Sequence, residues 1–144
     1  MSTKKFLTGG IVGAIVFFLL GYLVYGVLLA DFMKTNAGSA TGVEREMSQM
    51  IWWSLILGNL CIGFLLSYVL QRANASSASE AAGISAVVGL LMSSGHDFIM
   101  YATSNIANLT GVIADIAAFT VMSAISGAVI ALVAAPKKRM AAAQ

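Results

Sequence analysis

Charge is what this sequence has least of. Lys, Arg, Asp and Glu make up 10% of its 144 residues, whereas 59% are hydrophobic, and the mean hydropathy is +0.89. A soluble domain carries about 25% charged residues, so this composition excludes a protein whose whole surface faces water. A net charge of +2 is also too small to favour nucleic acid as a partner. The length predicts one domain, residues 1–144.

Cysteine and histidine are nearly missing as well. The single cysteine, Cys61, excludes an internal disulfide and a zinc finger, and the single histidine, His96, excludes bis-histidine haem ligation. The sequence contains no G-x-S-x-G, P-loop, H-E-x-x-H or C-x-x-C motif. We therefore expect a protein that is not an enzyme and that carries no cofactor or metal.

What the sequence does contain is four long apolar runs. They cover residues 6–30, 50–70, 81–101 and 108–134, and each is close to the roughly 20 residues with which an α-helix crosses the hydrocarbon core. Open strands in lipid would leave backbone groups unpaired, and the first run is too long for a signal peptide. The sequence predicts an all-α, polytopic membrane protein built as a four-transmembrane-helix bundle in the lipid bilayer.

The basic residues predict how this bundle is oriented. Six of them would fall on one side of a four-span path and two on the other, which is the bias expected when the richer side is cytoplasmic. The six are Lys4, Lys5, Arg72, Lys137, Lys138 and Arg139, and the two are Lys34 and Arg45. We expect both termini in the cytoplasm. Trp52 and Trp53 then lie at the outer interface, where indole rings are enriched.

Small residues recur at helical spacing and predict close packing of the spans. Between helices in lipid there is no hydrophobic driving force, so close backbone approach through small residues takes over. Candidate packing positions are Gly9, Gly13, Gly21, Gly58, Gly63 and Gly127. The main interpretation is packing within one bundle, and the alternative is a dimer contact through the Gly-x-x-x-Gly spacing of Gly9 and Gly13.

Ionisable groups inside the spans are the candidates for function, because such groups are costly in lipid and normally face the bundle interior. At 1.5 Å per residue, Asp97 lies about 6–8 Å, Tyr25 about 8 Å and Asp115 about 10 Å below the outer ends of their helices. These similar depths predict an outward-facing pocket in which the two carboxyl groups meet. Nearby positions complete the candidate set, which is Asp97, Asp115, His96, Asp31, Tyr25 and Asn59.

Two carboxylates without a basic partner should not both be ionised in a medium of low dielectric constant. They could share a proton, bind a cation, or pair with a charged His96. A structural role is the alternative, since a buried Asp often only bonds a neighbouring helix. A metal site is a further possibility, although no His-containing ligand spacing supports it.

The sequence resembles a group of small, uncharacterised four-span bacterial membrane proteins. The segments that carry the resemblance are Lys4–Leu7, Gly9–Gly10, Gly21–Gly26, Asp31–Phe32, Gly58–Leu60 and Gly127–Ile130. The resemblance covers nearly the whole chain and implies a location in the bacterial inner membrane. It implies no activity.

Three functions follow as expectations. The favoured one is a non-enzymatic accessory or structural subunit that packs against itself, as a homo-oligomeric scaffold, or against a larger membrane complex. The alternative is a minimal proton- or cation-handling transporter or channel that uses the Asp97/Asp115 pocket. The third is a lipid- or quinone-handling protein that uses Trp52, Trp53 and glycine-lined grooves.

Overall fold

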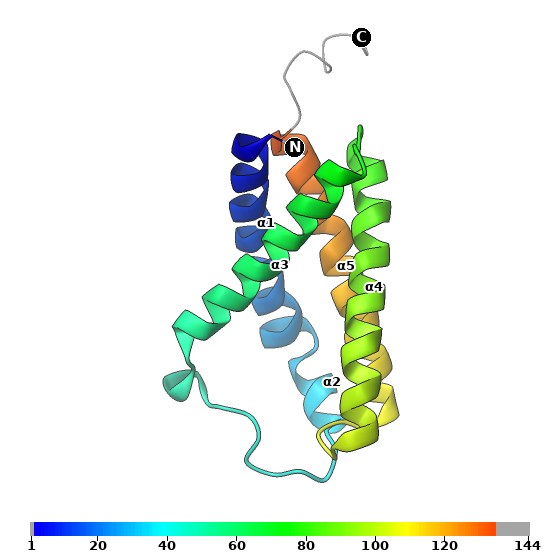
Figure 1. The fold of residues 1–144 in the computed structure, drawn as a ribbon. Helices are drawn as coiled ribbons and strands as arrows, with labels where there is room; N and C mark the ends of the chain where they lie inside the picture. Colours follow the sequence, from blue (N-terminus) through cyan, green and yellow to red (C-terminus); the bar gives the residue numbers. More distant parts are fainter. Residues whose placement is uncertain (1, 135–144) are drawn as a thin grey trace.

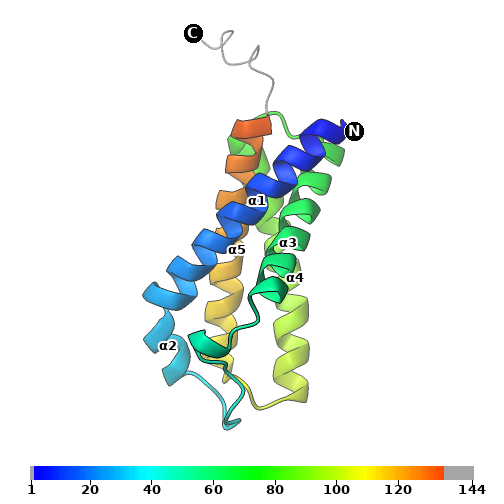
Figure 2. The ribbon, with the colours of Figure 1, turned by 90° about the vertical axis from the view of Figure 1, so that its left-hand side faces the viewer.

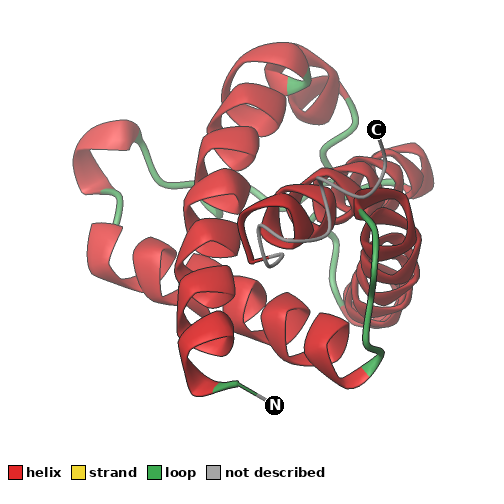
Figure 3. Cartoon of the chain, turned by 90° about the horizontal axis from the view of Figure 1, so that it is seen from above, coloured by secondary structure: helices red, strands yellow, loops and turns green. Residues whose placement is uncertain are grey.

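The computed structural model of the chain describes residues 2–134, and these residues form helices joined by loops, with no strand among them (Figures 1 and 3). The elements in order are α1 (Thr3–Leu23), the π-helical turn η1 (Val24–Leu28), α2 (Ala30–Thr35), the 3-10 turn η2 (Met47–Gln49), α3 (Trp52–Arg72), α4 (Ala78–Thr103) and α5 (Leu109–Ala134). Four helices are long and apolar enough to cross a membrane, namely Thr3–Leu28, α3, α4 and α5. The prediction of an all-α, four-helix membrane bundle is confirmed, and the chain is a multi-pass membrane protein.

The bundle has two distinct ends. The start of α1, the end of α3, the start of α4 and the end of α5 lie together at one end, which we call the terminal end (Figures 1 and 2). The short α2 and the loops around it lie at the opposite end, which we call the loop end. The basic run Lys137–Arg139, which helped to predict the orientation, lies outside the described residues.

The first span does not end as the sequence predicts. Instead of one helix over residues 6–30, α1 begins at Thr3, widens into the π-helical turn Val24–Leu28, and stops at Leu29, whose backbone leaves the helical region. The short α2 then starts at Ala30. An apolar run gives no sign of such a turn, because lipid-facing side chains look alike in an α-helix and in a π-helix.

The long helices associate mainly in pairs, α1 with α3 and α4 with α5, and α1 also packs on α5. Glycine makes these contacts close. A methyl group at Gly63 of α3 would collide with the backbone of Gly10 and Ala14 in α1, and one at Gly13 would lie 2.7 Å from Ile130 Cδ1 of α5. In lipid, such backbone approach is a main source of helix association.

Gly9 and Gly13 are therefore both buried within the chain's own bundle. A methyl group at Gly9 would lie 2.6 Å from Ser67 Oγ, and the Ser67 hydroxyl donates a 2.9 Å hydrogen bond to the Phe6 carbonyl oxygen. The alternative dimer contact through Gly9 and Gly13 is wrong for this structure, because α3 and α5 already cover that face of α1.

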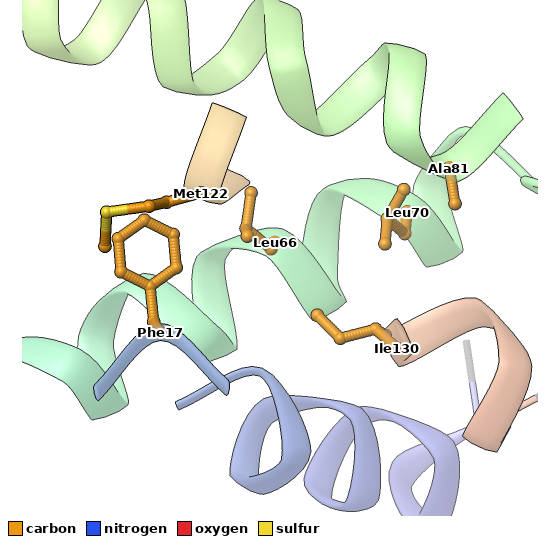
Figure 4. Packing of buried hydrophobic residues seen from close by; sticks show 6 residues of the cluster. All are labelled: Phe17, Leu66, Leu70, Ala81, Met122 and Ile130. Atoms are coloured by element: carbon orange, nitrogen blue, oxygen red, sulfur yellow. The ribbon is translucent and has the colours of Figure 1, made fainter. Parts of the chain in front are cut away.

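A buried apolar cluster joins all four long helices (Figure 4). Phe17 comes from α1, and its ring lies 5.0 Å from that of Phe119 on α5. The other members of the cluster are Leu66, Leu70, Ala81, Met122 and Ile130. Helix α3 contributes only Leu66 and Leu70 to the buried members of this cluster. The cluster therefore holds only the terminal-end half of α3 against the other helices.

The loop-end half of α3 diverges from the other helices (Figure 1). Every residue from 51 to 58 is exposed, and a methyl group at Gly58 would meet no described atom within 4 Å. The predicted packing role of Gly58 is therefore not seen within the described residues, because none of their atoms lies close to that position. Gly21, another predicted packing position, makes only an ordinary contact, since a methyl group there would lie 3.7 Å from Met122 Cε.

Two asparagines fasten the loops at the loop end. The Asn108 side chain accepts a 2.9 Å hydrogen bond from the Gly111 N–H, which caps the start of α5. The Asn108 N–H donates to the Asn36 carbonyl oxygen at 3.0 Å, and its side-chain amide donates to Asn36 Oδ1 at 3.2 Å. The segment after α2 is thereby tied to the first turn of α5.

Candidate functional site

The register of α4 against α5 sets which polar side chains meet. Gly89 lies against Ser123, and Gly127 lies against Ser85, because a methyl group at either glycine would collide with the opposing hydroxyl. Asp97 comes eight residues after Gly89, and Asp115 comes eight residues before Ser123. In two antiparallel helices with the same rise per residue, this register brings the two aspartates to the same level.

The side chains at that level interact. The Asp97 carboxyl group lies near the Asp115 carboxyl group, and the Tyr25 hydroxyl lies near Asp115 from the first span. Asp97 Oδ2 is buried and has no hydrogen-bond partner in residues 2–134. We call Asp97 and Asp115 the carboxylate pair. Three spans thus contribute to one polar cluster in an apolar bundle.

Local structure explains how each member reaches the cluster. On α4, residues four apart share one face, and Ala81, Ser85, Gly89 and Ser93 form a buried row on the face that leads to Asp97. Tyr25 sits in the π-helical turn, which inserts extra backbone into the helix wall. Single π-helical turns are found frequently at functional sites.

Helices α4 and α5 place no Lys or Arg beside the cluster. The sequence contains no Lys or Arg between Arg72 and Lys137. His96 adjoins Asp97 in the chain, but it is exposed on α4. Two carboxyl groups this close in a low-dielectric medium cannot both stay ionised without a compensating charge. A shared proton or a small bound cation would supply that compensation.

Two other predicted pocket residues lie elsewhere. Asp31 is exposed on the short α2. Asn59 belongs to α3, where its amide donates a 2.8 Å hydrogen bond to the Leu55 carbonyl oxygen. Of the six residues expected in one pocket, the structure brings together Asp97, Asp115 and Tyr25. The remaining three lie elsewhere for different reasons: Asn59 because α3 diverges, Asp31 because the first span breaks at Leu29, and His96 because it faces outward on α4.

Within residues 2–134, no three His, Cys, Asp or Glu side chains gather where they could hold a metal ion. The carboxylate pair therefore offers few of the oxygen ligands that a divalent cation needs, since Ca²⁺ takes about six to eight. A proton needs only one oxygen, or two that share it. The ligand set fits small monovalent species better than a divalent metal.

Two open grooves lie beside α3, away from the carboxylate pair. One, of about 470 Å³, is lined by Arg45, Ile51, Ser54, Leu55, Gly58, Asn59 and Ile62. The other, of about 270 Å³, lies between α1 and α3 and has an almost wholly apolar lining that includes Ile15, Phe18 and Ile56. Trp52 and Trp53 are exposed at the start of α3, and Trp53 is 70% exposed.

Sequence reasoning placed Ser126 on a stripe that faces the bundle interior, but it missed two other buried serines between α4 and α5, Ser85 and Ser123. Ser85, Ser123 and Ser126 are each at most 1% exposed, and their hydroxyl oxygens have no hydrogen-bond partner in the described chain. The spacing of Ser85, Gly89, Ser93 and Asp97 at every fourth residue was the available signal, since it places one polar stripe on one helix face.

Comparison of this chain with protein-family models, with curated proteins and with solved structures finds no match. The function must therefore be inferred from the site itself.

Proposed function

We propose that this protein handles a proton or a small monovalent cation at the carboxylate pair. The observation that carries the proposal is the proximity of Asp97 and Asp115, from two different spans, in a stretch of chain that has no Lys or Arg. Ionisable groups inside a membrane cost several kcal/mol when isolated and are therefore a common mark of ion pathways and proton relays. The Tyr25 hydroxyl adds a third oxygen from another span.

The test is ion flux in liposomes that contain the purified protein. Asp97→Asn and Asp115→Asn keep the shape of each side chain and remove its charge, and we expect either change to abolish flux. Asp31→Asn is the matched control, because Asp31 is an exposed carboxylate at the same end of the bundle. Flux that persists unchanged in both pair variants would overturn the proposal.

A second candidate function is supported by the free half of α3. Residues 51–58 are exposed on all sides, and they include the small residues Ser54 and Gly58. Small residues let helices in lipid approach closely, so this half of α3 suits contact with a second copy or with a subunit of a larger membrane complex. In that case the protein is an accessory or scaffold subunit.

The only cysteine in the chain provides the test of self-association. Cys61 is exposed on α3, next to this free half. A disulfide needs Cα atoms about 4.4–6.8 Å apart, so a symmetric contact along α3 predicts a cross-linked dimer on mild oxidation in liposomes. Cys61→Ser is the negative control, and Gly58→Cys in that background samples the next turn. Monomers at every position would argue against self-association through α3.

We further propose that the bundle lies in a bacterial inner membrane with its terminal end in the cytoplasm. Lys4, Lys5 and Arg72 lie at that end, in agreement with the preference of basic residues for the cytoplasmic side. Reporter fusions test the orientation. A reporter active only in the cytoplasm should work after residue 144 and fail when inserted after Gly42.

A further inference from the structure

The larger of the two grooves beside α3, of about 470 Å³, runs along one face of this helix. The residues of α3 that line it recur at spacings of three and four positions, which places them in one row: Ile51, Ser54, Leu55, Gly58, Asn59 and Ile62. A methyl group at Gly58 would meet no described atom within 4 Å. The groove is open because the loop-end half of α3 diverges from the other helices (Figure 1).

One charged side chain lies at this groove. Arg45, in the loop that precedes α3, is the only basic residue of the described chain that lines it. The neighbours Glu44 and Glu46 are exposed and do not line it. Apart from Ser54 and Asn59, the part of the groove formed by α3 has no polar side chain. The groove therefore combines a positive charge at the loop end with a mainly apolar floor.

The position of the groove matches one leaflet of the bilayer. Trp52 and Trp53 are exposed at the start of α3, and indole rings lie at the level of the lipid headgroups. The loop that carries Arg45 is therefore at headgroup level. At 1.5 Å per residue, the row from Ile51 to Ile62 extends about 16 Å along the helix. Half of the hydrocarbon core is about 15 Å thick, so the groove has the length of an acyl chain in one leaflet.

We propose that this groove binds one anionic phospholipid from the leaflet at the loop end. The Arg45 guanidinium group pairs with the lipid phosphate, to which its planar set of donors is suited. The Ser54 hydroxyl, near the start of α3, donates to an ester oxygen. One acyl chain lies along Leu55, Gly58 and Ile62. The site is separate from the carboxylate pair, and the proposal does not depend on ion handling there.

A second copy of the chain is the competing occupant, because Ser54 and Gly58 on the same face also suit a helix contact. Charge complementarity favours the lipid. An anionic headgroup neutralises Arg45 at the membrane surface, whereas a symmetric contact through the groove would bring two Arg45 side chains to the same level, where like charges repel.

The two tryptophans of the chain report on this site, since both lie at the start of α3. The experiment uses vesicles that mix phosphatidylglycerol, which is anionic, with phosphatidylcholine, which is not. Bromine is placed on the acyl chains of one lipid or the other, and the quenching of tryptophan fluorescence shows which lipid lies beside α3. From the attraction of one basic residue for anionic lipid, we expect the native chain to prefer phosphatidylglycerol about fivefold.

The two basic residues of the loop end provide a test variant and a matched control. Arg45→Gln should remove the preference for phosphatidylglycerol. Lys34→Gln should keep it, because Lys34 is exposed on α2 at the same end and does not line the groove. A preference that survives in Arg45→Gln would overturn the proposal. Equal loss in both variants would also overturn it, since general surface charge would then explain the attraction.

A second pair of variants tests the groove itself. Gly58→Leu places a side chain in the groove, whereas Gly83→Leu adds the same side chain on α4. Both glycines are exposed, and a methyl group at either would meet no described atom within 4 Å. We expect Gly58→Leu alone to abolish most of the preference for phosphatidylglycerol, and an unchanged preference in this variant would overturn the groove as the site.

Native mass spectrometry of the protein released from the same vesicles identifies the occupant. A monomer that retains phosphatidylglycerol, and loses it in Arg45→Gln, supports the lipid. A lipid-free dimer that Gly58→Leu dissociates would overturn the lipid proposal in favour of a second copy. Neither result bears on ion flux through the Asp97 and Asp115 variants, so the two proposals stand or fall separately.

Discussion

At the residue scale, glycine decides how close two helices come. Gly63 and Gly58 lie on the same helix, α3, yet one faces the backbone of α1 and the other faces open space. The sequence predicts a packing role for both, because both sit in an apolar run with similar neighbours. Which of them is used depends on the tilt of α3, and no local pattern encodes this tilt.

The two glycines therefore make a matched pair of substitutions. Gly63→Ala forces a methyl group into the backbone of Gly10 and Ala14 and should lower the free energy of unfolding by about 1–3 kcal/mol, as overpacking usually does. Gly58→Ala adds a methyl group in open space and should be neutral or stabilising by up to about 1 kcal/mol. Unfolding in mixed detergent micelles measures both. Equal destabilisation would mean that α3 packs along its whole length.

The aspartates show what sequence can and cannot give at this scale. Similar depths of Asp97, Asp115 and Tyr25 follow from counting residues to the helix ends, and the structure brings these three together. The same counting also includes His96 and Asn59, which lie elsewhere. Depth alone does not fix rotation about the helix axis, and rotation turns His96 outward although it adjoins Asp97.

At the element scale, helix α3 has two unlike halves. Leu66 is 1% exposed in the core cluster, whereas Leu57, on the loop-end half, is 52% exposed. Both halves consist mainly of apolar residues, so hydropathy predicts the span but not the division. The division arises because contacts with α4 and α5 reach only the terminal-end half.

Truncation of these two leucines should differ sharply in cost. Leu66→Ala leaves a cavity among packed helices and should lower the free energy of unfolding by about 2–5 kcal/mol. Leu57→Ala should cost less than about 0.5 kcal/mol, as surface substitutions usually do. Detergent unfolding monitored by circular dichroism provides the comparison. A large loss for Leu57→Ala in liposomes alone would point instead to an intermolecular contact there.

The other unpredicted elements have the same kind of cause. The π-helical turn at residues 24–28 and the caps at Asn36 and Asn108 depend on how distant segments meet. An Asn three residues before Gly111 was a readable N-cap signal. Its second bond, to Asn36, joins residues 72 positions apart and could not be read from local sequence.

At the scale of the whole molecule, the chain is two helix pairs. The α1–α3 pair and the α4–α5 pair meet chiefly where α1 packs on α5, and the connection between them is the short segment 73–77. Composition predicts the number of spans because lipid imposes their length. It does not predict the pairing, which follows from glycines and serines that could have met in several arrangements.

This organisation predicts that the chain can be divided. Fragments 1–75 and 76–144, expressed together, should associate in the membrane, because each contains one close-packed pair and the α1–α5 contact remains available. Co-purification through a tag on one fragment measures this. Division within α5, after Ala118, is the control. It should prevent assembly, because it cuts the helix that packs on both α4 and α1.

The crowding between α4 and α5 has a consequence for how this protein can vary. The side chains opposite Gly89 and Gly127 cannot be larger than serine. The size of these side chains is therefore fixed, whereas the presence of a hydroxyl oxygen on them is not. Exchange of Ser for Ala alters hydrogen bonding and leaves the outline almost untouched. Substitutions between Ser and Ala can therefore change the polarity of the bundle interior step by step while the backbone stays the same.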